Sequence, residues 1–212
     1  MCVMRNRKKA ILIALAIGDG HIKKESNSEC CSLCLIHSTK QEEFITYKRD
    51  LLHSLIGGKK PKLHYFKNNG YTGIRFQKAS KYYRILKKWL YVDGKKHISR
   101  FLLNKLTLEA IAIWYMDDGG LSPKLRNGKI HAYELFLNTH VSKEENQIII
   151  DYFKETWDIQ FHQVKNKGSY RLRMSTREIR KFLPMIKGFI IPSMKYKSTM
   201  IVPQVRGFYK NS

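Results

Sequence analysis

Acidic residues are scarce in this sequence. Only 17 Asp and Glu side chains stand against 40 Lys and Arg, which leaves a formal net charge of +23 at pH 7. An excess of this size calls for a polyanionic partner and is typical of proteins that bind nucleic acid. A disordered basic tail is excluded, because hydrophobic residues make up 43% and aromatic residues 12% of the chain.

Long apolar runs are also missing, since none reaches the roughly 18 residues that a membrane span requires. The basic start MCVMRNRKK and the apolar residues after it are similar to a secretory signal. The same kind of run recurs inside the chain at residues 108–116, where no signal peptide can lie. We therefore expect an intracellular protein without a membrane partner. A composition rich in Lys, Ile, Asn, Tyr and Phe indicates an A+T-rich genome, which leaves a mitochondrion, a chloroplast or bacterial or phage cytoplasm open.

Cysteine is confined to four residues near the N-terminus: Cys2, Cys30, Cys31 and Cys34. The last two have CxxC spacing, but no second pair and no His-x3-His completes a zinc site. We expect reduced thiols beside a strand rather than a metal centre. Four histidines likewise lack ligand spacing: His21, His64, His131 and His162.

What the sequence does contain is one short pattern that occurs twice, about a hundred residues apart. Residues 10–20 read AILIALAIGDG, and residues 108–119 read LEAIAIWYMDDG. Each is an apolar, helix-like run with small residues inside it, so two such helices can pack backbone to backbone and bring Asp19 and Asp118 to one seam. Negative charge is unfavourable at a helix C-terminus, so an aspartate at the same position in both copies indicates function.

This pattern resembles the LAGLIDADG motif of homing endonucleases, in the form with two copies on one chain. The match is clearest over residues 112–120, AIWYMDDGG. The first copy, IALAIGDG, has Gly18 where the second has Asp117. The resemblance covers roughly residues 8–203. It implies that Asp19 and Asp118 bind the catalytic metal, with neighbouring oxygens at Gly18 and Asp117.

The resemblance also implies one basic residue beside each active site. Lys96, in GKKHIS, and Lys197, in PSMKYKS, occupy comparable places after the closing helix of each half. Lys95 and Lys195 are adjacent alternatives. A cation there can stabilise charge that develops at a scissile phosphate or lower the pKa of an attacking water.

The repetition extends beyond the motif and predicts the architecture. In each half a strand, a helix, a hairpin and a closing helix follow, at residues 33–37, 38–55, 62–77 and 80–91, and again at 135–139, 142–157, 160–174 and 176–187. We expect an α+β protein of two pseudo-twofold, αββαββα-like LAGLIDADG repeats, residues 1–98 and 99–212. The resemblance implies two parallel central helices and two antiparallel sheets that form a DNA-binding saddle.

Period-2 alternation places basic and polar side chains on one face of each hairpin. With Ile74, Phe76, Leu172 and Met174 turned inward, the opposite face and the hairpin tips can enter a DNA groove. The predicted DNA-contacting residues are Lys62, His64, Lys67, Asn68, Arg75, Gln77, Gln163, Lys165, Asn166, Lys167, Arg171 and Arg173.

By resemblance, the function is metal-dependent, site-specific cleavage of both strands of a long DNA target by a monomer. Hard carboxylate oxygens suit Mg2+, and Mn2+ is the expected substitute. The chain begins with Met and shows no splicing-junction residues, so we expect a free-standing or intron-encoded enzyme rather than an intein. Two alternatives stay open: a maturase that binds its host intron RNA on the same fold, and a transcription regulator, for which the expected helix-turn-helix is missing.

Overall fold

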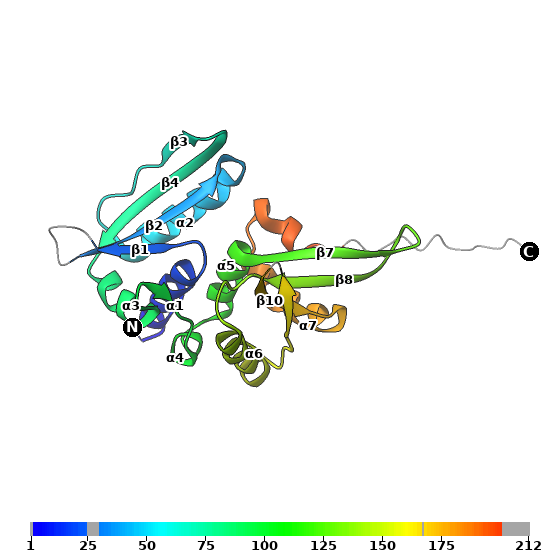
Figure 1. The fold of residues 1–212 in the computed structure, drawn as a ribbon. Coiled ribbons are helices and arrows are strands. Elements are labelled where there is room, and N and C mark those ends of the chain that lie inside the picture. Colours follow the sequence, from blue (N-terminus) through cyan, green and yellow to red (C-terminus); the bar gives the residue numbers. More distant parts are fainter. Residues whose placement is uncertain (1, 25–29, 167, 201–212) are drawn as a thin grey trace, which may run out of the picture.

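The computed structural model describes residues 2–24, 30–166 and 168–200, and it consists of two halves with the same order of elements (Figure 1). The first half contains α1 (Cys2–Ile17), β1 (His21–Lys24), β2 (Cys31–Ser38), α2 (Glu42–Ile56), β3 (His64–Asn68), β4 (Tyr71–Ser80) and α3 (Tyr82–Leu90). The second contains α5 (Leu108–Asp118), β7 (Gly119–Arg126), β8 (Lys129–Leu137), α6 (Lys143–Trp157), β9 (His162–Asn166), β10 (Ser169–Met174) and α7 (Thr176–Ile186). The prediction of two αββαββα-like halves is confirmed.

Short elements join the halves and follow α7. β5 (Tyr91–Val92), β6 (Lys95–Lys96) and α4 (Arg100–Leu103) join the halves, and the 3-10 turns η2 (Lys187–Phe189) and η3 (Pro192–Lys197) follow α7. A third 3-10 turn, η1 (Thr39–Gln41), lies between β2 and α2 in the first half. The boundary expected between residues 98 and 99 falls between β6 and α4 and stays a prediction. Among the described residues, no helix combines the length and the apolar character needed to cross a lipid bilayer.

Each half contains one four-stranded antiparallel sheet, in the orders β1-β2-β4-β3 and β7-β8-β10-β9. The hairpins predicted over residues 62–77 and 160–174 are confirmed as β3–β4 and β9–β10. The first strand after each motif was not located in the sequence. In β1 only Ile22 is buried, and β7 carries Pro123, which an edge strand tolerates because one row of its amides needs no partner.

The two motif helices form the centre of the core. Every residue from Ala10 to Ile17 in α1 and from Ala110 to Met116 in α5 is buried. Arg7 of α1 donates two hydrogen bonds of 2.6 Å to Glu109, in the first turn of α5. Beyond the other end of α1, the backbone amide of Asp19 donates to Asp117 at 3.3 Å. The helices therefore run parallel, as predicted.

A methyl group at Gly18 is expected to destabilise this helix pair. A Cβ atom there would overlap the Asp117 carboxylate, so we expect Gly18→Ala to lower the free energy of unfolding by about 1–3 kcal/mol in urea titrations. Gly188→Ala is the matched control, because its Cβ would meet no atom within 4 Å. Equal losses in the two variants would contradict the close helix approach.

Candidate active site

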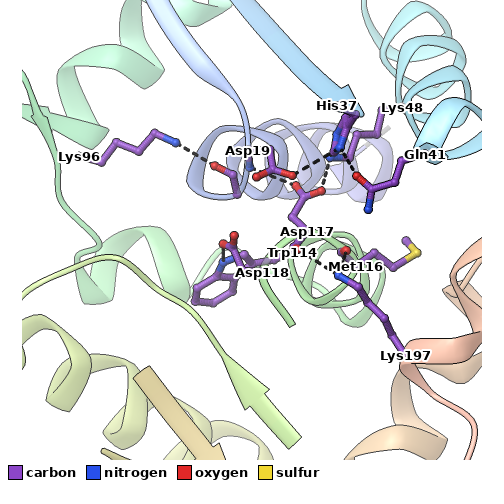
Figure 2. A network of polar contacts seen from close by, with 11 residues as sticks. Asp19, His37, Gln41, Lys48, Lys96, Trp114, Met116, Asp117, Asp118 and Lys197 are labelled. Atoms are coloured by element: carbon purple, nitrogen blue, oxygen red, sulfur yellow. Dashed lines mark hydrogen bonds and ion pairs between the residues drawn. The ribbon is translucent and has the colours of Figure 1, made fainter. Parts of the chain in front are cut away.

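The two motif aspartates meet where α1 and α5 end. Asp19 follows α1 closely, and Asp118 is the last residue of α5. Both line one cavity of about 280 Å³, together with Ile17, Gly18, Lys96, Ile98, Thr139, His140 and Val141. The structure thus brings the predicted carboxylates together at one hollow in the seam (Figure 2).

Asp118 is the more enclosed of the two carboxylates. Its Oδ2 accepts a hydrogen bond of 2.9 Å from the Trp114 indole nitrogen. Burial raises the pKa of Asp118 to about 8, and the nearby charges of Asp117 and Asp19 add to the shift. The Asp19 side chain is 39% exposed. A bound cation would favour the ionised form of Asp118, so the cavity has the donor chemistry of a metal site.

A lysine from each half reaches the backbone just before each motif aspartate. Lys96 Nζ donates to the Gly18 carbonyl at 2.8 Å. Lys197 Nζ donates to the carbonyls of Met116 and Asp117 at 2.5 and 3.1 Å. Burial lowers the pKa of both lysines. The pseudo-twofold plan thus holds for these two amines.

The adjacent alternatives for the basic role lie elsewhere. Lys95 and Lys195 are both exposed, whereas Lys96 is half-buried and Lys197 is 9% exposed. The carbonyl contacts of Lys96 and Lys197 therefore distinguish them from their neighbours in the sequence. Their part in catalysis stays a prediction.

A buried ion pair stands beside Asp19 and breaks the twofold symmetry. Lys48 of α2 pairs with Asp117 Oδ1, and both side chains are fully buried. Lys48 Nζ also lies 3.0 Å from His37 Nε2, and His37 Nδ1 lies 3.0 Å from Gln41 Oε1 (Figure 2). Burial and the Lys48 charge lower the pKa of His37 to about 4, so a neutral ring can accept from Lys48 and donate to Gln41.

This network defines the surroundings of Asp117. Burial raises the pKa of Asp117 to about 6, while Lys48 acts in the opposite direction. Ligand atoms of Asp19, His37 and Asp117 lie within 4.8 Å of one another, a spacing that suits a metal ion. Lys48 Nζ already contacts His37 and Asp117, so the lysine ammonium group, and not a metal ion, supplies the positive charge at this position.

Gly18 and Asp117, the other expected metal ligands, therefore already have partners. The Gly18 carbonyl accepts from Lys96, and the Asp117 carboxylate faces Lys48 and the Asp19 amide. A backbone carbonyl oxygen has two lone pairs, so the carbonyls of Gly18 and Asp117 can each accept a lysine and still bind a metal. This contribution to a metal site stays a prediction.

The sequence did not single out His37, Gln41 or Lys48. One signal was present: Lys48 lies on the buried face of α2 with Phe44, Ile45 and Leu52. A lysine on an otherwise apolar helix stripe requires a buried acid as its partner. Asp117, which has no acidic counterpart in the first motif, is that acid.

The concave face of the first sheet carries three predicted DNA-contacting residues. His64, Arg75 and Gln77 line a groove of about 1020 Å³ that Asp19 also lines. Ile74 and Phe76, which alternate with them along β4, are fully buried on the other face, as predicted. The groove therefore connects this face to the seam.

The second sheet presents Arg171 and Arg173 with a carboxylate between them. Arg171 and Arg173 lie 3.8 and 3.9 Å from Glu134 Oε1, and Lys124 pairs with the other oxygen. Glu134 is 7% exposed, while Leu172 and Met174 are fully buried on the opposite face. Since a lone carboxylate would repel phosphates, its three cationic partners make this face compatible with DNA.

Gln163 corrects the predicted DNA-contacting set. It opposes the buried Leu172 in the β9–β10 register, and its amide donates to the Lys143 carbonyl at 3.0 Å. Because successive strand residues point to opposite faces, Gln163 lies on the helix side. Lys167 lies outside the described residues. Lys165, two residues along β9, shares the side of Gln163 but is exposed near the hairpin tip. Four others surround the hairpins as exposed or half-buried side chains: Lys62, Lys67, Asn68 and Asn166.

The CxxC pair is split between two faces of β2. Cys31 is 5% exposed in the core, whereas Cys34 lines the concave groove. One ion cannot be chelated by both residues.

Comparisons with known proteins agree with this geometry. Residues 9–182 match the model of the LAGLIDADG DNA endonuclease family. The structure is similar to that of the homing endonuclease I-WcaI bound to its DNA recognition sequence, with a TM-score of 0.79 and 26% identity over 93% of this chain and 88% of that chain.

Two relatives in sequence are a RecA protein and a maturase. Protein RecA of Mycolicibacterium chitae is 26% identical over 93% of this chain and 47% of its own length. Cytochrome b mRNA maturase bI2 of Debaryomyces hansenii is 26% identical over 85% of this chain and 69% of its own length. The chain spans about half the length of the RecA proteins that it matches.

Proposed function

Because the chain belongs to the LAGLIDADG DNA endonuclease family, whose model matches residues 9–182, we propose that it is a monomeric homing endonuclease that cuts both strands of a specific DNA target. One observation carries the proposal. Each half brings one motif aspartate to the seam and one lysine amine to the carbonyl just before it. Basic faces of the two sheets flank this pair of sites, one for each DNA strand.

Asp19 and Asp118 would hold the divalent cation, which we propose is Mg2+, with Mn2+ as a substitute. The donor set fits because hard carboxylate oxygens face one cavity and burial disfavours the bare charge of Asp118. A bound ion supplies Lewis acidity and a more acidic water. Lys96 and Lys197 would place positive charge beside the scissile phosphates, and their lowered pKa lets them exchange protons more readily than exposed lysines.

Cleavage of a randomised plasmid library tests the proposal. With Mg2+, the protein should linearise plasmids that share one long sequence. With Ca2+ in its place, it should bind the selected sequence without cutting it. Binding of DNA without cleavage of any sequence in Mg2+ or Mn2+ would contradict the nuclease.

The similarity to a maturase favours a second candidate, an RNA-binding protein that assists the folding of its host intron. Structured RNA would be recognised through its shape and phosphates by the same basic faces. Tight RNA binding by a protein that cuts no DNA would favour this candidate over the endonuclease.

Substitution of Lys96 or Lys197 should uncouple the cleavage of the two DNA strands. We expect Lys96→Met and Lys197→Met each to slow cleavage of one strand by about 10²-fold, because each removes a cation beside one site. Nicked circles would then accumulate in a time course. Lys95→Met and Lys195→Met are matched controls, since these neighbours are exposed. Equal losses in the controls would assign the effect to overall charge.

A further inference from the structure

An apolar stripe that the core does not use runs along the outside of α3. Tyr82, Ile85 and Trp89 are 46%, 52% and 37% exposed and share one face of the helix at i, i+3 and i+7. The buried face of the same helix is formed by Tyr83, Leu86 and Leu90. The helix is thus apolar on two faces, and packing in the core explains only one of them.

The stripe borders a shallow groove between α3 and α1. The groove encloses about 90 Å³ and is lined by Lys9, Leu12, Ile13, Tyr82, Ile85, Leu86 and Trp89. Exposed apolar surface continues beyond the groove, because the Trp89 ring meets that of Phe101 edge-on at 5.1 Å. Phe101 is itself 50% exposed. Contiguous exposed apolar surface of this kind marks an interaction site.

The second half provides an internal control. In α7, Ile179, Phe182 and Ile186 are buried with the spacing of Tyr83, Leu86 and Leu90 in α3. The stripe positions Tyr82, Ile85 and Trp89 then correspond to Glu178, Lys181 and Met185, of which the first two are polar. These polar residues contact the loop after α6: Glu178 accepts from the Gln160 amide, and Lys181 pairs with Asp158. The fold therefore does not require an exposed apolar stripe at this helix.

Positive charge surrounds the groove. Lys8 Nζ lies 4.0 Å from the centre of the Tyr82 ring, and Lys105 Nζ lies 3.9 Å from that of Phe101. Lys9 lines the groove itself. A second copy of this chain is a poor occupant, because each copy has a net charge of +23. The complementary partner is apolar at its centre and acidic at its edges.

We propose that the α1–α3 groove binds an amphipathic helix of a partner protein, with apolar side chains in the groove and acidic residues along its flanks. A cleft between two helices suits a third helix, which binds through residues spaced i, i+3 or i+4 and i+7. Arg75 and Gln77 line the concave groove of the first sheet, whereas α3 packs below that sheet beside α1 (Figure 1). The partner and DNA therefore bind different faces.

Fluorescence anisotropy with a labelled helical peptide tests this surface on the full chain. The probe has leucines at i, i+3 and i+7 and glutamates elsewhere. It should bind at least ten times more tightly than a peptide with lysine for glutamate, and than one with serine for leucine. The serine peptide separates groove binding from general attraction to a basic protein, so equal affinity for it would overturn the proposal.

Two variants introduce into α3 the residue types that α7 has at the corresponding positions. Ile85→Lys and Tyr82→Glu should each weaken probe binding at least tenfold, while thermal unfolding and DNA binding stay unchanged because both side chains are half exposed. Leu125→Lys, at a residue 63% exposed outside the groove, is the matched control and should bind the probe normally. Unchanged binding in both groove variants would overturn the proposal. Groove variants that still bind the peptide but no longer bind single-stranded RNA would also overturn the proposal, and they would assign the stripe to nucleic acid.

Discussion

Replacing Asp118 with asparagine is expected to abolish DNA cleavage and, in the metal-free protein, to increase stability. Cleavage should fall by at least about 10³-fold, because the substitution removes a metal ligand from the seam. Stability should rise by about 1–3 kcal/mol at pH 8, because the variant no longer holds a partly buried carboxylate whose ionisation the site opposes. Plasmid cleavage and denaturant unfolding in EDTA measure the two effects.

The pH dependence provides a further check on Asp118. The folded protein holds the Asp118 proton up to about pH 8, whereas the unfolded chain releases it near the ordinary carboxyl pKa of 3.8. The stability of the wild type should therefore fall as the pH rises between these values, and this fall should be smaller in Asp118→Asn. Asp19→Asn should lose cleavage equally without the gain in stability, since Asp19 is 39% exposed. A destabilised Asp118→Asn protein would show that the charge is already compensated.

Removal of the Lys48 ammonium should produce the largest loss of stability. Lys48→Met leaves the Asp117 carboxylate buried without its cation, and such an orphaned charge costs about 3–5 kcal/mol. His37 would also lose its contact with Lys48. Urea unfolding of the wild type and the variant at pH 7 measures the loss.

A second substitution should restore most of that stability. In Lys48→Met/Asp117→Asn the charge is removed with its partner, so we expect the double variant to be more stable than Lys48→Met alone. Lys40→Met, at an exposed lysine of η1, should change stability by less than about 0.5 kcal/mol. A loss in Lys48→Met no greater than that of Lys40→Met would show that the pair does not stabilise the fold.

Most of the fold was predictable because it depends on short-range patterns. Alternation in β4 and β10 placed Ile74 and Leu172 inward, and both are fully buried. The helix predicted over residues 142–157 is α6, and the structure adds a capping box between Ser142 and Glu145 at its start. The strands β1 and β7 escaped prediction, since an edge strand needs neither strict alternation nor freedom from proline.

The site was predictable where the motif repeats and not where the halves differ. Asp19 and Asp118 were found because both precede glycine after a helix. Gln163 was misplaced because only the β9–β10 register shows that it shares a face with Leu172. Glu134 was missed because its neighbours Arg171 and Arg173 come from another strand, brought beside it by the fold.

The sequence by itself determined the duplicated α+β plan, the positive charge and the pair of aspartates, because each follows from composition or from a pattern a few residues long. Only the tertiary structure decided that Lys96 and Lys197, rather than their neighbours, reach the motif carbonyls, and that Lys48 neutralises Asp117. Those contacts join residues 69 to 81 positions apart. Helices and strands repeat over a few residues, so the packing of whole elements, and not any local pattern, selects the side chains that meet at the seam.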